Sequence, residues 1–293
     1  MTTTTTRSSR SRRPLTDAEK EQRVKDAHDR IAAGVKQIQT SEDWQRWLRT
    51  GARFHRYSFN NIMLILSQCP DATRVASSST WHKMNRWTLR GSKAIWIFAP
   101  ILVKYTREEI AEDPRREGQS HLIGFKTVPV FDISQTDGEP LPTNPINERP
   151  ELLEGDAPDK AQQIADLLCD LGYSIEAGDP GINGAHGITD MVNHRIIIRE
   201  GLGDAHTFKT VMHELAHANL HDPRVAPEGL TRSVAEVEAE SVAFIVCEYF
   251  GVKSDAYSFE YVTGWAGRDV DAVMSTGARV MTCAKHIINA LEK

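Results

Sequence analysis

The sequence is poor in cysteine and has no long apolar run. Its 293 residues include four cysteines, Cys69, Cys169, Cys247 and Cys283, which are widely spaced and form no CxxC pair. This usage argues against a zinc finger and is typical of reduced thiols in a cytoplasmic protein. No apolar run reaches membrane-spanning length, and the first residues lack the apolar segment of a secretory signal. We therefore expect a cytoplasmic protein with a disordered basic tail over residues 1–16.

One stretch of the chain has almost no acidic residues. Between Trp44 and Arg107, eleven basic residues stand against the single acid Asp71, a net charge of +10, whereas the whole chain has a formal net charge of −5. Five of the six tryptophans fall in the same stretch. This polarity indicates that one part of the protein meets an anion.

Cations and aromatic residues alternate in the middle of this basic stretch. Cations attract phosphates and unpaired bases stack on aromatic faces, so the composition favours binding of single-stranded DNA. No recognition helix for the major groove of a duplex is evident. A basic surface over an aromatic core is the alternative. The candidate DNA-binding residues of this segment are Trp81, Lys83, Arg86, Trp87, Arg90 and Lys93.

A metal-binding motif lies in the second half of the chain. His213 and His217 are four residues apart, within an apolar pattern of helical spacing from Phe208 to Leu220. A helix places both histidines on one face, where they can bind one metal ion, with Glu214 beside them as a general base. This is the HExxH arrangement of zinc peptidases. A surface helix with solvated histidines is the alternative.

The third ligand is expected from a helix that carries three glutamates. Glu236 and Glu240 share a stripe beside the apolar face, whereas Glu238 projects about 200° away from Glu236. Glu236 is therefore the first choice, and Glu240 is expected to accept a hydrogen bond from a liganding histidine. Glu238 stays a rival, because Glu238-Ala239 fits a step of related peptidases. For His221 we expect a capping or surface role.

The pattern of elements predicts an α+β protein with two domains. The first, over residues 17–140, has helices followed by two antiparallel strands at 94–103 and 121–132. A proline-rich linker over 141–158 leads to the second, over 159–293. Its expected elements are a helix at 161–171, a buried strand at 196–198, the metal helix and a helical C-terminal segment at 258–291.

Two parts of the chain resemble known families. Tyr57 to Asn61, the segment from Trp81 to Lys93, Ile95 to Pro100 and Val130 to Thr136 resemble the N-terminal single-stranded-DNA-binding domain of ArdC-type antirestriction proteins. This resemblance adds Tyr57 and Asn61 to the DNA-binding candidates. Residues 186–240 resemble the ImmA/IrrE group of small, gluzincin-like metallopeptidases. The union of the two is the ArdC architecture.

These patterns lead to one functional hypothesis with two alternatives. We expect a single-stranded-DNA-binding, zinc-dependent metallopeptidase-like protein, active in antirestriction or DNA protection when mobile-element or phage DNA enters a cell. Zinc, with manganese as the alternative, lowers the pKa of a bound water, and Glu214 takes its proton. The partners would be single-stranded DNA and an unidentified protein or peptide, without a membrane. The alternatives are a regulatory metalloprotease that cleaves a repressor and a catalytically silent DNA-binding protein with a structural metal.

Overall fold

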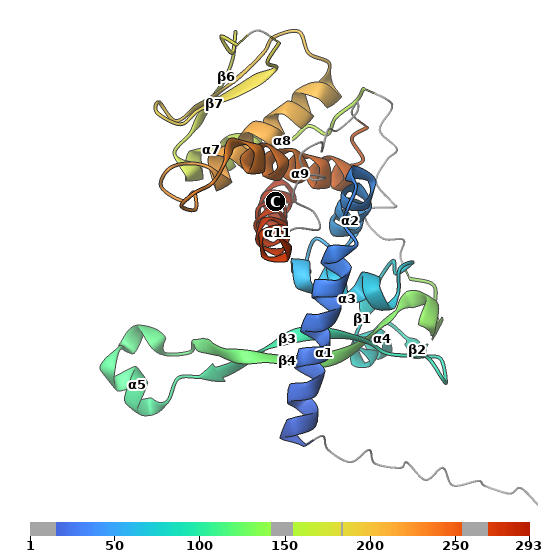
Figure 1. Ribbon diagram of the computed structural model, residues 1–293. Coiled ribbons are helices and arrows are strands. Elements are labelled where there is room, and N and C mark those ends of the chain that lie inside the picture. Colours follow the sequence, from blue (N-terminus) through green and yellow to red (C-terminus); the bar gives the residue numbers. More distant parts are fainter. Residues whose placement is uncertain (1–15, 142–154, 183, 254–268) are drawn as a thin grey trace, which may run out of the picture.

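The protein has a mixed α+β fold with several small sheets and a helical C-terminal region (Figure 1). The computed structural model describes residues 16–141, 155–182, 184–253 and 269–293. The helices are α1 (Asp17–Lys36), α2 (Ser41–Arg53), α3 (Phe59–Gln68), α4 (Ser78–Lys83), α5 (Arg107–Glu112), α7 (Ala161–Leu171), α8 (Asp204–Leu220), α9 (Arg232–Phe250) and α11 (Val270–Leu291). The strands are β1 (Val75–Ala76), β2 (Arg86–Thr88), β3 (Ile95–Lys104), β4 (Ser120–Asp132), β5 (Thr136–Gly138), β6 (Ser174–Ala177), β7 (Gly187–Asp190) and β8 (Arg195–Ile198).

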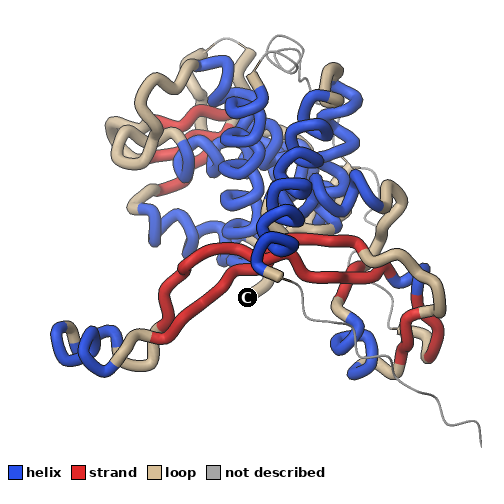
Figure 2. Tube along the Cα trace, turned by 60° about the horizontal axis from the view of Figure 1, so that its bottom comes forward, coloured by secondary structure: helices blue, strands red, loops and turns tan. Residues whose placement is uncertain are grey.

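A long antiparallel hairpin of β3 and β4 dominates the N-terminal half. Its register runs from Ile95 opposite Val130 to Lys104 opposite Ser120, which confirms the predicted antiparallel pair. Near its base the hairpin buries Ile95, Ile97 and Val130. Beyond a bulge at Ile101 it extends away from the helices and carries α5 near its far end (Figures 1 and 2). The hairpin therefore has a buried base and an exposed arm.

Helices from the two halves of the chain share one hydrophobic core. Trp44 on α2 is fully buried and donates its indole N–H to Ser241 Oγ on α9 at 2.9 Å. On α11, Gly277 lies so close to α3 that a Cβ there would fall 2.2 Å from the ring of Phe59. Small residues permit this close approach because they leave room for the facing ring. The residues of this core run from Ala27 to Leu291.

A second, smaller sheet lies beside the helix with the HExxH motif. Its strand order is β6-β8-β7, with β6 parallel and β7 antiparallel to β8. Ile196 and Ile198 of β8 are buried, as the isoleucine run predicts, whereas Ile197 is only partly buried. The strand β7 is an edge of this sheet and packs against α8. Among the described residues no strand pairs with the outer edge of β7, so a free strand edge lies next to the motif.

Several predicted segments lie partly outside the described residues. These are the basic tail over 1–16, the linker over 141–158 and the start of the C-terminal segment before Asp269. The division into domains at 17–140 and 159–293 stays a prediction. Within the described residues, no helix is long and apolar enough to span a membrane.

Candidate metal centre

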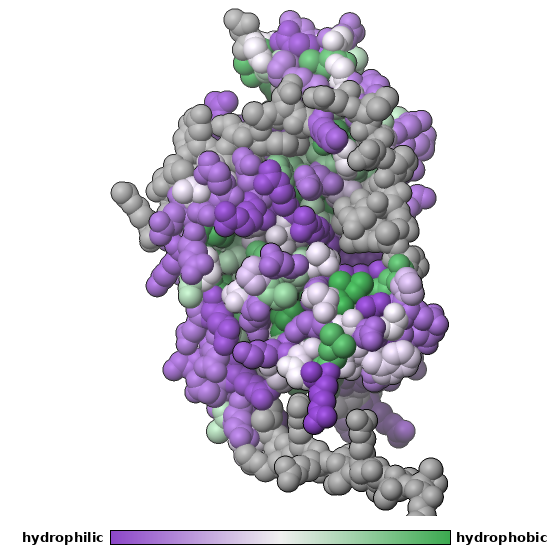
Figure 3. All heavy atoms as spheres, turned by 90° about the vertical axis from the view of Figure 1, so that its right-hand side faces the viewer, coloured by the Kyte–Doolittle hydropathy of each residue, from purple (hydrophilic) through white to green (hydrophobic). Residues whose placement is uncertain are grey.

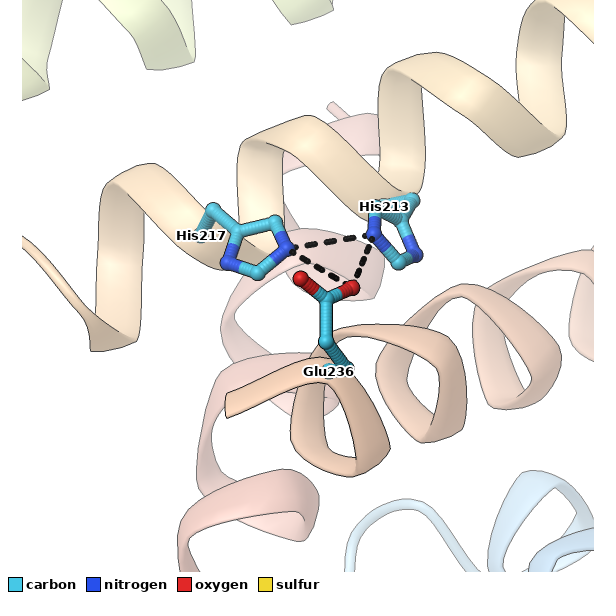
Figure 4. Close-up of side chains that lie close together, drawn as sticks. All are labelled: His213, His217 and Glu236. Carbon is cyan, nitrogen blue, oxygen red and sulfur yellow. Dashed lines mark hydrogen bonds and ion pairs between the residues drawn. The ribbon is translucent and has the colours of Figure 1, made fainter. Parts of the chain in front are cut away.

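The helix α8 positions both histidines of the motif. Its buried residues include Phe208, Met212 and Leu215, at the spacing that fixes which face turns inward. His213 and His217 lie one turn apart on the side that faces α9, and their side chains stay partly exposed (Figure 4). The two Nε2 atoms are 3.1 Å apart. The helix therefore aims two imidazole nitrogens at one point.

The helix α9 adds a carboxylate to the pair. Thr231 caps its start by accepting a hydrogen bond from the N–H of Val234, which places Glu236 near the first turn. Glu236 Oε2 lies 3.5 Å from Nε2 of His213 and 3.7 Å from Nε2 of His217 (Figure 4). The three side chains converge from two helices that pack directly on each other.

The donor atoms have the spacing that a small divalent ion requires. A tetrahedral ion with ligands at about 2.1 Å holds neighbouring donor atoms about 3.4 Å apart. The separations of 3.1, 3.5 and 3.7 Å lie on both sides of this value. All three side chains are partly exposed, which leaves a side of the site open to solvent. The residues present therefore fit a divalent metal held by two histidines and one glutamate.

Carboxylates make the site electrostatically suited to a cation. Burial opposes the charged form of His213, but hydrogen bonds to Glu236 and Glu240 outweigh it and raise the pKa of His213 to about 9. His213 and His217 in turn hold the pKa of Glu236 far below its usual range. Burial works against ionised Glu240, yet His213 and Lys209 lower the pKa of its carboxyl group. The ionised carboxylates attract a positive ion, and protonated His213 must lose a proton to bind it.

Glu240 supports the first histidine from behind. Its Oε2 lies 3.1 Å from Nδ1 of His213, on the ring edge opposite the nitrogen that faces Glu236. The Nζ of Lys209 is 3.0 Å from the other carboxylate oxygen. Accepting the Nδ1–H of His213 leaves the Nε2 lone pair free for a metal and fixes the ring orientation.

Glu238 points away from the metal group. Its fully buried carboxylate lies 2.9 Å from Nε2 of His221 and accepts a hydrogen bond at 2.9 Å from Nε of Arg279 on α11. His221 is buried as well, so the expected surface role is wrong, although it does follow the last residue of α8 as its C-cap. A helix turns the side chain two residues after Glu236 to another face, which places Glu238 here instead of beside the histidines.

His221 connects this buried pair to the second histidine. Its Nδ1 lies 2.8 Å from Nδ1 of His217. Burial lowers the pKa of His221, so its ring is neutral at pH 7. With Nε2–H donated to Glu238, Nδ1 of His221 can accept the Nδ1–H of His217. The chain His217–His221–Glu238–Arg279 thus fixes the ring of His217 in the same sense as Glu240 fixes that of His213.

The edge strand β7 holds Glu214. Thr189 donates its hydroxyl proton to Glu214 Oε2 at 2.7 Å, or to the backbone carbonyl of Glu214 at 2.9 Å. Gly187 leaves the space that Glu214 occupies, because a Cβ at residue 187 would lie 2.9 Å from Oε1. Glu214 is buried, and its negative charge acts on the neighbouring His213. This is a place from which it can exchange a proton with a group at the open side of the site.

Two of the predicted DNA-binding residues serve the fold. Trp81 is 0% exposed and donates its indole N–H to the carbonyl of Phe131 at 2.9 Å, so it is a core residue and cannot stack on a base. The guanidinium of Arg86 donates to the side chain or carbonyl oxygens of Thr136 and to the carbonyl of Glu139. Arg86 therefore ties β2 to the chain around β5, and its donors are engaged there.

Two further candidates have their polar groups engaged inside the fold. The amide of Asn61 accepts from the N–H and donates to the carbonyl of Phe98, at 2.8 and 2.9 Å. The hydroxyl of Tyr57 donates to the carbonyl of Val75 at 3.0 Å, while its ring stays partly exposed. Asn61 thus joins α3 to β3, and Tyr57 keeps only its ring for a ligand.

The remaining four candidates are at the surface. Trp87 is 55% exposed, and Lys83, Arg90 and Lys93 are exposed as well. They lie on β2 or within a few residues of it, and β2 pairs with β5 in a two-stranded sheet. This sheet lies on the side of the molecule that faces the viewer in Figure 3, where the surface is mostly hydrophilic with scattered apolar side chains. These side chains can reach a nucleic acid without any change in the fold.

Residues 19–131 match the N-terminal domain of the anti-restriction factor ArdC. The chain therefore contains an ArdC-type N-terminal domain. Two crystal structures of the antirestriction protein ArdC from plasmid R388 have a similar fold at 15% sequence identity. The Mn(II)-bound structure gives a TM-score of 0.55 over 91% of this chain and 97% of that protein. The metal-free structure gives 0.52 over 80% and 85%.

A curated relative extends the comparison beyond the N-terminal domain. The uncharacterized protein pXO2-81 of Bacillus anthracis is 26% identical over 96% of this chain. The chain spans 53% of the length of that relative.

Sequence reasoning missed three residues around the metal group. Thr189 lies in the edge strand β7, and nothing in its local sequence pattern singles out its hydroxyl. Arg279 and the buried role of His221 depend on how α11 packs against α8 and α9. The presence of a histidine directly after the motif helix is the one signal that pointed to this part of the site.

Proposed function

We propose that the protein is a single-stranded-DNA-binding, metal-dependent peptidase-like protein that counters restriction of DNA entering a cell. The group of His213, His217 and Glu236 with Glu214 beside it carries this proposal. The match to the ArdC N-terminal domain supports the part that concerns DNA. The metal is zinc, the commonest ion for these ligands, or manganese, which the similar ArdC structure binds.

In this proposal the chain's own residues bind and move protons around the metal. A divalent ion, when bound, lowers the pKa of water and polarises a carbonyl group. Glu214, held by Thr189, takes a proton from the attacking water and returns it to the leaving amine. The free edge of β7 binds an extended peptide as an added strand, next to the ligand histidines.

The variant Glu214→Gln tests this proposal. Peptide cleavage should fall about 10²- to 10⁴-fold, because the amide cannot accept the proton, while bound metal stays at the wild-type level. A protein substrate is first sought by mass spectrometry with and without single-stranded DNA. The control is Glu248→Gln, an exposed residue of α9. Undiminished cleavage by Glu214→Gln would refute the assignment.

A second function is protection of DNA by occupancy alone, with a structural metal. The observation that favours it is that the family match covers the N-terminal domain and not the metal site. The same variant decides between the two functions. If Glu214→Gln protects incoming DNA from restriction as well as the wild type does, binding is the activity and hydrolysis is incidental.

A further inference from the structure

A hollow lies where the hairpin base meets the helices of both halves of the chain. It has a volume of about 700 Å³ and is bounded by α1, the start of α3, α11 and the strands β3 and β4. We call it the α3–α11 hollow. Its volume lies in the range of small-molecule pockets, about 300–1,000 Å³. None of its lining residues belongs to the metal group or to the two-stranded sheet of β2 and β5.

Aromatic rings form one wall of the α3–α11 hollow. Phe125 on β4 is 55% exposed, so a large part of its ring is open to a ligand. It meets the ring of Phe98 on β3 edge to face, with centroids 6.3 Å apart. His28 on α1 lies 5.0 Å from the same Phe98 ring, and the ring of Tyr57 also lines the space. The wall therefore offers several π faces at one opening.

Positive charge borders these rings. Arg56, before α3, and Lys285, on α11, both line the hollow and are exposed. Among the described residues neither forms an ion pair, and no carboxylate lines the hollow. A neutral apolar ligand gains nothing from two cations at this opening, whereas an anionic ligand with a flat apolar part can use both the cations and the rings.

The walls are held in place before any ligand binds. Asn61 fixes Phe98 through both of its amide hydrogen bonds, and the hydroxyl of Tyr57 is anchored to Val75. On the opposite side, Gly277 lets α11 approach α3 closely enough for Lys285 to line the same space as Arg56. A preformed site loses less entropy on binding than one that must order first.

We infer that the α3–α11 hollow binds one or two unpaired nucleotides of a single strand. A base stacks against Phe125 and Phe98, and its phosphates contact Arg56 and Lys285. A base paired within a duplex cannot enter such a space, so the site selects single strands. The inference rests on the proposed DNA binding. It adds where the strand binds, at a site that includes α11 from the C-terminal half of the chain.

The test measures binding of a fluorescein-labelled 12-nucleotide oligothymidylate to the full chain by fluorescence anisotropy. Phe125→Ala removes the exposed ring, and Ala278→Trp fills the hollow from α11 without changing charge. Each should weaken binding about tenfold or more. The matched controls are Ile123→Ala, an exposed residue of the same strand that does not line the hollow, and Ala278→Ser.

The charges are tested by salt dependence. Arg56→Ala with Lys285→Ala should lower the slope of log K against log salt by about 0.7 for each lost phosphate contact. Circular dichroism of each variant checks that the fold is retained. The inference is overturned if these variants bind as the wild type does while Arg90→Ala and Lys93→Ala weaken binding, in which case the proposed DNA binding still stands. A wild-type protein that binds no oligothymidylate at any salt refutes both.

A second chain is the competing occupant. If Phe125→Ala and Ala278→Trp change the mass in sedimentation but leave oligothymidylate binding unchanged, the hollow is a contact between copies and the inference is wrong.

Discussion

The metal-site helices and the basic segment from Trp81 to Lys93 use their side chains in different ways. On α8 and α9, the side chains of the motif and its glutamates meet at one point, and each ligand histidine has a hydrogen-bonded support. In the basic segment, residues close together in the sequence lie in different environments. Trp81 is in the core, Arg86 ties two strands, and Trp87 lies at the surface.

The difference follows from the kind of pattern that each region carries. A spacing of four residues on a helix fixes where two side chains point, whatever surrounds the helix. The composition of a segment says which residues it contains but not which of them face inward. Tryptophan suits both a core and a base-stacking surface, so Trp81 and Trp87 look alike until the fold separates them.

Replacing the two tryptophans would show this separation most strongly. Trp81→Ala should lower the free energy of unfolding by about 3–5 kcal/mol, because it empties a fully buried site. Trp87→Ala, at a surface position six residues on, should change it by no more than about 0.5 kcal/mol. Urea titrations followed by circular dichroism measure both values. Equal losses of stability would mean that the segment is not divided between core and surface as described.

On the metal side, His221→Ala should weaken metal binding about 10- to 100-fold, because His217 loses the group that orients its ring. His221→Gln, which keeps a donor and an acceptor, should restore part of the affinity. Calorimetric titration with Zn²⁺ or Mn²⁺ gives the dissociation constants, with His286→Ala on the exposed side of α11 as the control. An unchanged affinity in His221→Ala would show that the buried chain only supports the fold.

A smaller effect is expected on the pH dependence of metal affinity. With its pKa raised to about 9, His213 carries a proton at pH 7, and this proton must leave when a metal binds. Metal affinity should therefore rise about tenfold per pH unit between pH 7 and 9 and level off above. The stability of the metal-free protein changes with pH in the opposite direction. The folding free energy that comes from the raised pKa of His213 is fully present below pH 6.5 and is lost as the pH rises to 9.

Calorimetry in buffers of different ionisation enthalpy counts the released protons. About one proton per ion from His213 is expected at pH 7, and the absence of any release would contradict the charge state described for the site.

Much of the metal group could be predicted from the sequence, but the residues that hydrogen-bond to its side chains and hold them in place could not. The apolar stripe of α9 distinguishes Glu236 and Glu240 from Glu238, because helical geometry turns Glu238 to another face. The partners of Glu238 and Glu214 come from α8, α11 and β7. Which segments meet there depends on tertiary packing, which no local pattern contains. The strands β3 and β4 were predictable because both are long and rich in apolar and β-branched residues.

The metal content of two glutamate variants tests the central claim most directly. After dialysis against excess Zn²⁺ or Mn²⁺ and removal of free ion, the wild type should hold one ion per chain by atomic emission. Glu236→Gln should lose it, whereas Glu238→Gln, two residues away and outside the group, should retain it. A full complement of metal in Glu236→Gln, together with its loss in Glu238→Gln, would contradict the site described.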